Sequence, residues 1–201
     1  MISSLTAEKL ALTRGDRKLF SGLNFRVGAG QALAVEGANG VGKTSLLRLI
    51  AGFLTQASGA LVLTSQGMEI TDGEERGHYA AWLGHQDGLK PQLTVAEQLS
   101  FFARLYRSIS DCDAVLEQVG LTRQSALPCR YLSAGQKRRL ALARLLVSGR
   151  SLWLLDEPFA ALDTAGQALV GQLMALHCSA GGLVIAATHD PLGLGNQRVV
   201  L

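Results

Sequence analysis

The stretch ALAVEGANGVGKTSLLRLI, residues 32–50, decides the fold of this chain. It reads as an apolar strand, a glycine-rich loop and the start of a helix. Gly40 and Gly42 let the loop turn its N–H groups toward phosphate oxygens, and the helix dipole adds positive potential there. Lys43 is expected to reach the β- and γ-phosphates, and the Thr44 hydroxyl to bind Mg²⁺. The stretch therefore predicts a P-loop for a nucleoside triphosphate; the alternative is a chance glycine-rich turn before a helix.

Composition places the chain among globular proteins. Of its 201 residues, 48% are hydrophobic and 17% charged, and the net charge of +3 does not by itself indicate a nucleic-acid partner. Cys112, Cys129 and Cys178 lie far apart without a CxxC pair, which favours free thiols in a reducing compartment. The start of the chain does not resemble a signal peptide, and no apolar run approaches the ~18 residues of a membrane span. We expect a cytosolic chain unless another protein holds it at a membrane.

Strand-like and helix-like segments alternate along the chain, as in an α/β protein. The middle, residues 87–148, is mostly helical, which suggests a helical insertion in an α/β core. Thr94 and Glu97 have the spacing of a capping box at a helix start. Strands are expected at residues 5–12, 23–27, 32–36, 61–64, 80–83, 152–155, 183–187 and 199–201, and helices starting at Lys43, Thr94, Ala114, Gly135 and Thr164.

The segment SLWLLDEPFAALD, residues 151–163, is a second chemical signal. Its apolar run predicts a buried strand that ends in Asp156, at the strand end where ligands bind in α/β sheets. Asp156 can hold Mg²⁺, and Glu157, whose side chain leaves in another direction, can act as general base on a water. The alternative is a turn-forming aspartate followed by a solvated glutamate.

The segment YLSAGQKRRLALARLL, residues 131–146, predicts a helix with an unusual charge pattern. Ser133 is a plausible N-cap. Three cations, Lys137 to Arg139, follow at the positive end of the helix dipole, where each normally costs roughly 0.3–1 kcal/mol. The pattern suggests a helix start that faces an anion; the alternative is an ordinary serine-capped helix.

LSAGQ resembles the LSGGQ signature of the ATP-binding-cassette (ABC) ATPases. In that family the signature of one subunit contacts the γ-phosphate held by the P-loop of the other. The resemblance implies a trans signature made of Ser133, Ala134, Gly135 and Gln136, and it makes a partner's ATP the anion at this helix.

The other motifs of the family follow in order. The resemblance implies that Gln86 is the Q-loop residue, which touches Mg²⁺ and couples to the membrane partner. Asp163 matches the D-loop residue at the dimer seam, and His189 matches the switch histidine at the γ-phosphate. ATP and Mg²⁺ are the implied cofactors, with Thr44, Gln86 and Asp156 as metal ligands, Glu157 and His189 as catalytic residues, and a nucleotide site made of Gly37, Asn39, Gly40, Gly42, Lys43, Thr44, Ser45 and Arg14.

Two positions depart from the family pattern. Ala134 replaces one glycine of the usual pair, so its methyl group narrows the approach to the trans phosphate. Arg14 stands where the family places an aromatic residue under adenine, and its guanidinium can stack on the base. Phe20 is the aromatic alternative, although it also suits the core.

The implied fold is an α/β P-loop NTPase with a mixed, largely parallel sheet, an antiparallel β subdomain and a helical subdomain. We expect one ABC ATPase domain over residues 1–201. Residues 1–86 and 149–201 would form the P-loop core with its β subdomain, and residues 87–148 the helical subdomain.

Within the family, stretches such as LFSGLNFRVGAGQ and WLGHQDGLKPQLTVAEQLSFF are similar to the ATP-binding subunit of the bacterial haem exporter of cytochrome c maturation. This implies a homodimer of cassettes on integral-membrane partners at the cytoplasmic face of the inner membrane. Its ATP hydrolysis would power haem export or release of a haem-loaded chaperone. Direct haem binding is not expected because CxxCH is absent, and a nucleic-acid partner is not expected either. The alternatives are an ATPase for another small substrate, a soluble nucleic-acid-linked ABC ATPase and a P-loop kinase.

Overall fold

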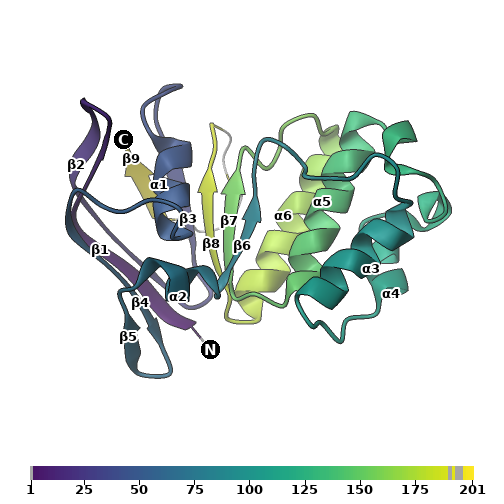
Figure 1. Ribbon diagram of the computed structural model, residues 1–201, viewed down its shortest axis with the longest axis horizontal. Helices are drawn as coiled ribbons and strands as arrows, with labels where there is room; N and C mark the ends of the chain where they lie inside the picture. Colours follow the sequence, from purple (N-terminus) through teal and green to yellow (C-terminus); the bar gives the residue numbers. More distant parts are fainter. Residues whose placement is uncertain (1, 190–191, 193–196) are drawn as a thin grey trace. The chain divides into compact units, whose positions relative to one another are not determined.

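The computed structural model describes residues 2–189, 192 and 197–201 (Figure 1). The chain divides into two compact units: unit 1 is made of residues 1–82, 150–158 and 173–201, and unit 2 of residues 83–149 and 159–172. This grouping and the predicted domain boundaries differ for residues 83–86, 149 and 159–172.

Unit 1 contains a four-stranded antiparallel sheet with the order β2-β1-β4-β5. The two long strands β1 (Ile2–Arg14) and β2 (Arg17–Gly28) form a hairpin, and β4 (Ser58–Ser65) pairs with the other edge of β1. The short strand β5 (Met68–Ile70) follows β4. Only two residues join β1 to β2, and Gly15 takes a left-handed φ of 57° there, which suits a tight hairpin.

A five-stranded sheet has the order β6-β7-β8-β3-β9. Its strands are β6 (Ala80–Leu83), β7 (Leu152–Asp156), β8 (Leu183–Ala187), β3 (Ala32–Glu36) and β9 (Gln197–Val200). The pairs β7–β8, β8–β3 and β3–β9 are parallel. Every residue of β7 and β8 is buried, as expected for apolar strands covered on both faces.

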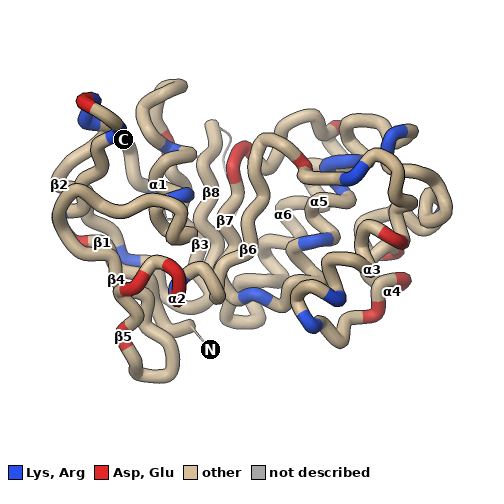
Figure 2. Tube along the Cα trace, viewed as in Figure 1, with Lys and Arg blue, Asp and Glu red and all other residues tan. Residues whose placement is uncertain are grey.

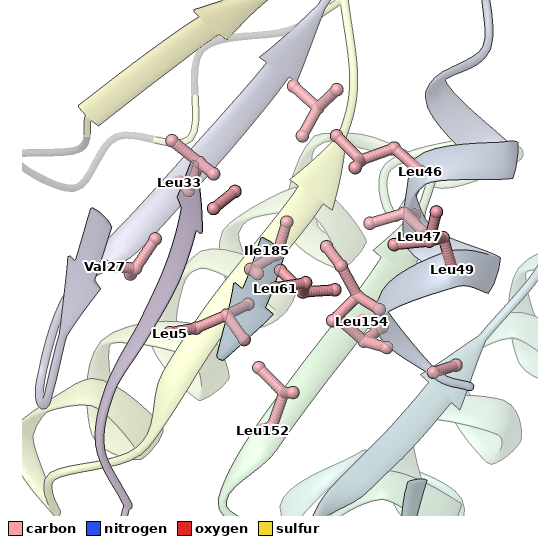
Figure 3. Close-up of a cluster of buried hydrophobic side chains, with 14 of the residues drawn as sticks. Leu5, Val27, Leu33, Leu46, Leu47, Leu49, Leu61, Leu152, Leu154 and Ile185 are labelled. Carbon is pink, nitrogen blue, oxygen red and sulfur yellow. The ribbon is translucent and has the colours of Figure 1, made fainter. Parts of the chain in front are cut away.

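One apolar cluster joins both sheets of unit 1 to helix α1 (Lys43–Ile50). Figure 3 shows Leu5 and Leu61 of the antiparallel sheet near Ile185 and Leu154 of the parallel sheet, with Leu47 of α1 beside them. All five side chains are buried. This packing fixes the helix that begins in the glycine-rich loop.

Arg76, in the short helix α2 (Gly73–Gly77), holds the other end of α1. Its side chain is almost completely buried, and it donates to the last carbonyls of α1, from Nε to Ile50 O (3.0 Å) and from Nη2 to Leu49 O (3.1 Å). Nη1 donates to Thr71 O at 2.9 Å. Burial lowers the pKa of Arg76 from its usual value. A cation at the negative end of the helix dipole thus satisfies carbonyls that have no partner within the helix.

Unit 2 is mainly helical (Figure 1). Helices α3 (Val95–Leu105), α4 (Cys112–Gln118) and α5 (Ala134–Ser148) pack on one another, with the short 3₁₀ helices η1 (Thr122–Gln124) and η2 (Cys129–Tyr131) between α4 and α5. Helix α6 (Thr164–Ser179) begins in unit 2 and ends in unit 1. The capping box of Thr94 and Glu97 is confirmed, with hydrogen bonds of 3.2 and 2.8 Å.

All predicted strands are present, and the α/β class is confirmed. Thr94 is the N-cap of α3 rather than its first residue, whereas α5 begins one residue and α4 two residues before the predicted start. The last strand ends at Val200 instead of residue 201. The short elements β5, α2, η1 and η2 were not predicted.

The helices and the cysteines of the chain were also subjects of sequence predictions. No helix within the described residues is both long and apolar enough to cross a bilayer. All three cysteines are free thiols, as predicted; Cys129 and Cys178 are buried, and Cys112 is partly exposed.

Candidate nucleotide site

The glycine-rich loop leads directly into α1. Gly42 is the N-cap of the helix, and no side chain caps its first turn, so N–H groups there stay available to an anion. Gly37 and Gly42 have φ values of 142° and 126°, which other residues rarely adopt. A Cβ added at Gly42 would also lie 3.3 Å from Leu19 Cβ and 3.4 Å from Phe20 Cδ1 of strand β2. The loop therefore needs glycine at both positions.

Lys43, the first residue of α1, points its ammonium group back across the loop. Nζ donates to Gly37 O at 2.7 Å and lies 2.9 Å from Nε2 of His189. The residue is only 7% exposed. A buried cation between a carbonyl and an imidazole nitrogen is already placed where phosphate charge would bind.

His189, just after β8, meets three polar side chains at one ring nitrogen. Besides Lys43, Nε2 lies 3.1 Å from Asn39 Oδ1 and 3.7 Å from Glu157 Oε1. Nε2 cannot accept from Lys43 and donate to Asn39 at once, so the tautomer of the ring decides which of the two contacts is a hydrogen bond. His189, the glycine-rich loop and Glu157 thus lie together in unit 1.

Two oxygen-bearing side chains meet beside this cluster. Thr44 Oγ1 donates to Asp156 Oδ2 at 2.9 Å, and Asp156 is only 2% exposed at the end of β7. In Figure 2 the tube is red at the end of β7. A hydroxyl and a buried carboxylate form the hard oxygen pair that Mg²⁺ prefers. The described residues contain no cluster of three His, Cys, Asp or Glu side chains that would suit another metal.

Glu157 follows Asp156 in an uncommon backbone conformation. Its φ is 48°, in the left-handed region, and its N–H donates to Ala187 O of β8 at 2.9 Å. The two carboxylates therefore point in different directions, and that of Glu157 faces His189. Strain of this kind costs on the order of 1–3 kcal/mol and concentrates at functional sites.

The two candidates for the base platform differ in their exposure. Phe20 is buried in the apolar cluster, whereas Arg14 is exposed at the end of β1. Gly40 has a left-handed φ of 77°, and Ser45 is partly buried in the first turn of α1.

The predicted signature segment lies in unit 2, at the start of α5. Ser133 is the N-cap, as predicted, and forms a capping box with Gln136, in which Gln136 N donates to Ser133 Oγ at 3.2 Å. Ser133 and Ala134 are exposed. A Cβ added at Gly135 would lie 3.5 Å from Ala161 O, an ordinary contact, so the chain itself does not require glycine there.

Two of the cations that follow, in the blue run at the start of α5 in Figure 2, have partners within unit 2. Buried Arg138 donates from Nη1 to Gly84 O (2.7 Å) and pairs with Asp87 (3.3 Å). Arg139 pairs with Asp163, the predicted D-loop residue, at 3.6 Å. Arg138 and Arg139 thus have acidic partners within the chain, whereas the prediction that the helix start faces an external anion stays a prediction.

The segment after β6 is attached to α5 by two arginines. Besides Arg138, Arg144 donates from Nη1 to Asp87 O at 3.2 Å, and burial lowers the pKa of Arg144. Gln86 lies beside them and lines a cavity of about 510 Å³ with His85, Asp87, Gly88, Leu89, Pro91, Cys129, Arg130 and Lys137. Sequence reasoning considered Arg138 only as a charge at the helix start and missed Arg144; a charge within the apolar stretch LALARLL is the signal that would have found Arg144.

Comparison with known proteins decides the family. Residues 20–160 match the sequence model of the family described as ABC transporter. The chain belongs to the ABC transporter family. It is thus an ATP-binding, ATP-hydrolysing transporter subunit, as the resemblance of its motifs predicted.

Relatives of this ABC cassette span nearly its whole length. A "cytochrome c biogenesis ATP-binding export protein CcmA" from Rhodopseudomonas palustris (strain BisB5) is 51% identical over 196 residues, which are 97% of this chain and 96% of the relative. One from Bradyrhizobium diazoefficiens is 50% identical with the same coverage. An ABC transporter ATP-binding protein from Pyrococcus furiosus is 19% identical with a TM-score of 0.85, over 99% of this chain and 98% of that one, and confirms the fold.

The predicted site residues of the ABC cassette are divided between the two units. Unit 1 brings Asn39, Lys43, Thr44, Asp156, Glu157 and His189 into one cluster. Unit 2 holds Gln86, the signature residues and Asp163. The specific roles of these side chains stay predictions.

Proposed function

We propose that this chain is the ATPase subunit of an ABC transporter complex in cytochrome c biogenesis, where its ATP hydrolysis powers haem export or the release of a haem-loaded chaperone. The observation that carries the proposal is the 51% identity over 97% of the chain to a cytochrome c biogenesis ATP-binding export protein. The converging cluster around Lys43 supports it with a site suited to nucleotide chemistry.

In this proposal the loop of residues 37–45 binds the phosphate chain. The first N–H groups of α1 would receive phosphate oxygens, and Lys43 would exchange Gly37 O and His189 for the β- and γ-phosphates. Thr44 and Asp156 fit Mg²⁺, with Gln86 as a further predicted ligand. Bound Mg²⁺ would neutralise charge on the phosphate oxygens.

Glu157 is proposed as the general base. Its carboxylate belongs to the same cluster as Lys43 and His189, where a water could lie in line with the γ-phosphate. His189 is proposed to hold that phosphate by donating a hydrogen bond from Nε2 after Lys43 has moved to the nucleotide, which requires the ring proton on that nitrogen. The chain's own groups thus position the phosphate and accept the proton of the water.

A second cassette would complete the site. Ser133, Ala134, Gly135 and Gln136 are proposed to contact the γ-phosphate bound by the partner's P-loop, with Asp163 at the seam. The exposure of Ser133 and Ala134, and the space at Gly135, support this role because the chain itself leaves this helix start uncovered.

The proposed assembly is a homodimer of cassettes on integral-membrane subunits at the cytoplasmic face of a bacterial inner membrane. The printed names of the relatives, which describe export proteins, support a membrane partner. We propose that the cassette itself binds neither haem nor nucleic acid.

Complementation tests the biological assignment. In a bacterium that lacks its own ATPase for cytochrome c maturation, the gene for this chain should restore haem staining of c-type cytochromes. Lys43→Ala should not restore it, because the charge of the phosphate chain then lacks its buried cation. A stable, membrane-associated wild-type chain that restores nothing, while its ATPase activity is intact, would contradict cytochrome c biogenesis and favour another substrate.

A further inference from the structure

Unit 2 contains a cavity of about 510 Å³ between the segment after β6 and the start of α5. Its volume falls within the roughly 300–1,000 Å³ of pockets that bind small organic molecules. Leu89, Pro91 and Cys129 line it with apolar surface, and we call these three residues the apolar wall. Burial raises the pKa of the Cys129 thiol, so this group stays uncharged at neutral pH. The wall is therefore suited to a hydrocarbon.

Hydrogen bonds on two sides fix the shape of this cavity. Besides the two arginines that bind Asp87, Gln98 of α3 holds the loop by accepting from Lys90 N at 2.7 Å. The side chain of Gln98 belongs to a residue that is only 1% exposed. On the other side, Arg130 N donates to Pro91 O at 3.0 Å. The cavity is thus formed before a ligand arrives, and binding costs little ordering of the chain.

Two cations at this cavity have no acidic partner among the described residues. Lys137 and Arg130 both line it, and neither forms an ion pair with a described residue. Asp87, the acidic residue of the lining, is already paired with Arg138 at 3.3 Å. The guanidinium carbon of Arg130 lies 4.7 Å from the ring centre of Tyr131, a contact that holds the side chain but leaves its charge uncompensated. The cavity therefore carries an excess of positive charge.

The main chain beside the cavity offers few hydrogen bonds to a peptide. The N–H groups of Cys129 and Arg130 already donate to Leu93 O and Pro91 O, at 2.8 and 3.0 Å. Pro91 has no N–H to donate. An extended peptide that binds by strand addition depends on such groups, whereas a small molecule does not. Two cations beside an apolar wall match a ligand with one anionic head and an apolar body.

We propose that this cavity binds a small organic carboxylate with an aliphatic or aromatic body. Lys137 and Arg130 bind the carboxylate through charge-assisted hydrogen bonds, and the apolar wall covers the hydrocarbon. Gln86 lines the same cavity, so the ligand lies beside the predicted Q-loop residue. The site uses none of the nucleotide-binding residues of unit 1, and it does not depend on the proposed function.

Displacement of a fluorescent probe from the full chain tests this site. Anilinonaphthalene sulfonate is an aromatic anion whose fluorescence rises in apolar surroundings, and octanoate should displace it from the wild type. Octanol has a hydrocarbon of the same length but no charge, so it should displace the probe roughly tenfold more weakly. Inorganic tripolyphosphate, which has charge but no apolar body, should leave the probe in place.

Charge variants locate the site. Lys137→Met keeps the apolar stem but removes the charge, and it should weaken octanoate binding roughly fivefold. Arg130→Gln should act in the same way, whereas Lys137→Arg should stay within about twofold of the wild type. Arg123→Gln is the matched control, since it removes an exposed arginine from η1 in the same unit and should change nothing. ATP affinity should be unchanged in all four variants, because the P-loop lies in unit 1.

Several outcomes would overturn the site: equal displacement by octanol and octanoate, displacement by tripolyphosphate, or unchanged octanoate affinity in both Lys137→Met and Arg130→Gln. A helical peptide rich in glutamate and leucine that displaces the probe where octanoate fails would assign the cavity to a protein segment instead. Sedimentation velocity tests a second copy as the occupant, because a nucleotide-free dimer that octanoate dissociates would assign the cavity to that contact.

Discussion

The ammonium group of Lys43 connects the P-loop to the segment after β8. Its contacts to Gly37 O and His189 Nε2 satisfy the cation in a site where it is 7% exposed. An isolated buried cation would carry a desolvation penalty of several kcal/mol. These two partners reduce that penalty and hold the cation beside the loop, where a phosphate chain could replace them.

Glu157→Gln is the sharpest substitution at the residue scale. Gln keeps the size of the side chain but cannot accept the proton of the attacking water, so hydrolysis should slow by roughly 10²-fold or more. Nucleotide affinity should stay within about threefold because Lys43 and Thr44 are unchanged. Steady-state ATPase assays and nucleotide binding on the same preparation measure both.

Asp113→Asn is a matched control, since it also neutralises a carboxylate but lies on α4 in unit 2. Normal turnover in Glu157→Gln would exclude Glu157 as the general base.

At the scale of elements, α1 is held at both ends by different means. Its start is placed by the glycine loop and Lys43, and its end by the buried guanidinium of Arg76 on Leu49 O and Ile50 O. Gly52 adds to this joint, because a Cβ there would lie only 2.0 Å from Gly73 O. The last turn of the P-loop helix therefore has little freedom to shift.

Arg76→Met should destabilise the protein by about 3 kcal/mol, because it leaves buried carbonyls at the end of α1 without donors. Urea denaturation, followed by circular dichroism, measures this loss as a lower midpoint with an unchanged slope. Arg48→Met, an exposed arginine on the same helix, should change stability by less than about 0.5 kcal/mol. Equal stability of the two variants would show that the carbonyl contacts of Arg76 contribute nothing.

Contiguous signals made much of this structure predictable. Lys43, Asp156 and Ser133 each lie in a short segment whose residue types predict a strand, a loop or the start of a helix. The structure places each residue at the predicted boundary between elements. The elements that escaped prediction are short: β5, η1 and η2 have three residues each and α2 has five, too few to show a period.

Long-range polar contacts were beyond sequence reasoning for a different reason. The partners of Arg76 and Arg138 are backbone carbonyls 26 and 54 residues away, and a carbonyl has no residue type to recognise. The contact of His189 with Asn39 spans 150 residues. Such contacts can be identified only when the fold is known, whereas the P-loop can be recognised from neighbouring residues in the sequence.

At the scale of the whole molecule, substitutions in the signature segment test the proposed head-to-tail dimer of cassettes. Gly135→Asp should leave nucleotide affinity of the isolated chain within about threefold, but it should abolish ATP-dependent dimerisation by placing negative charge against the partner's γ-phosphate. In a mixture with Lys43→Ala chains, both lesions fall in one composite site of the head-to-tail dimer, and the other site is intact. Some ATP-induced pairing should return, measured by light scattering after gel filtration.

Each variant alone serves as the control, since neither should pair. Loss of nucleotide binding by the Gly135→Asp monomer would place LSAGQ in its own chain's site and contradict the trans arrangement.

The left-handed backbone of Glu157 has a consequence for attempts to make this protein more robust. A φ of 48° suits glycine better than glutamate, so a screen that selects only for resistance to heat would favour Glu157→Gly. The same exchange removes the carboxylate beside His189. Thermostability and turnover therefore compete at this single position, and directed evolution of the cassette needs a selection for activity to retain it.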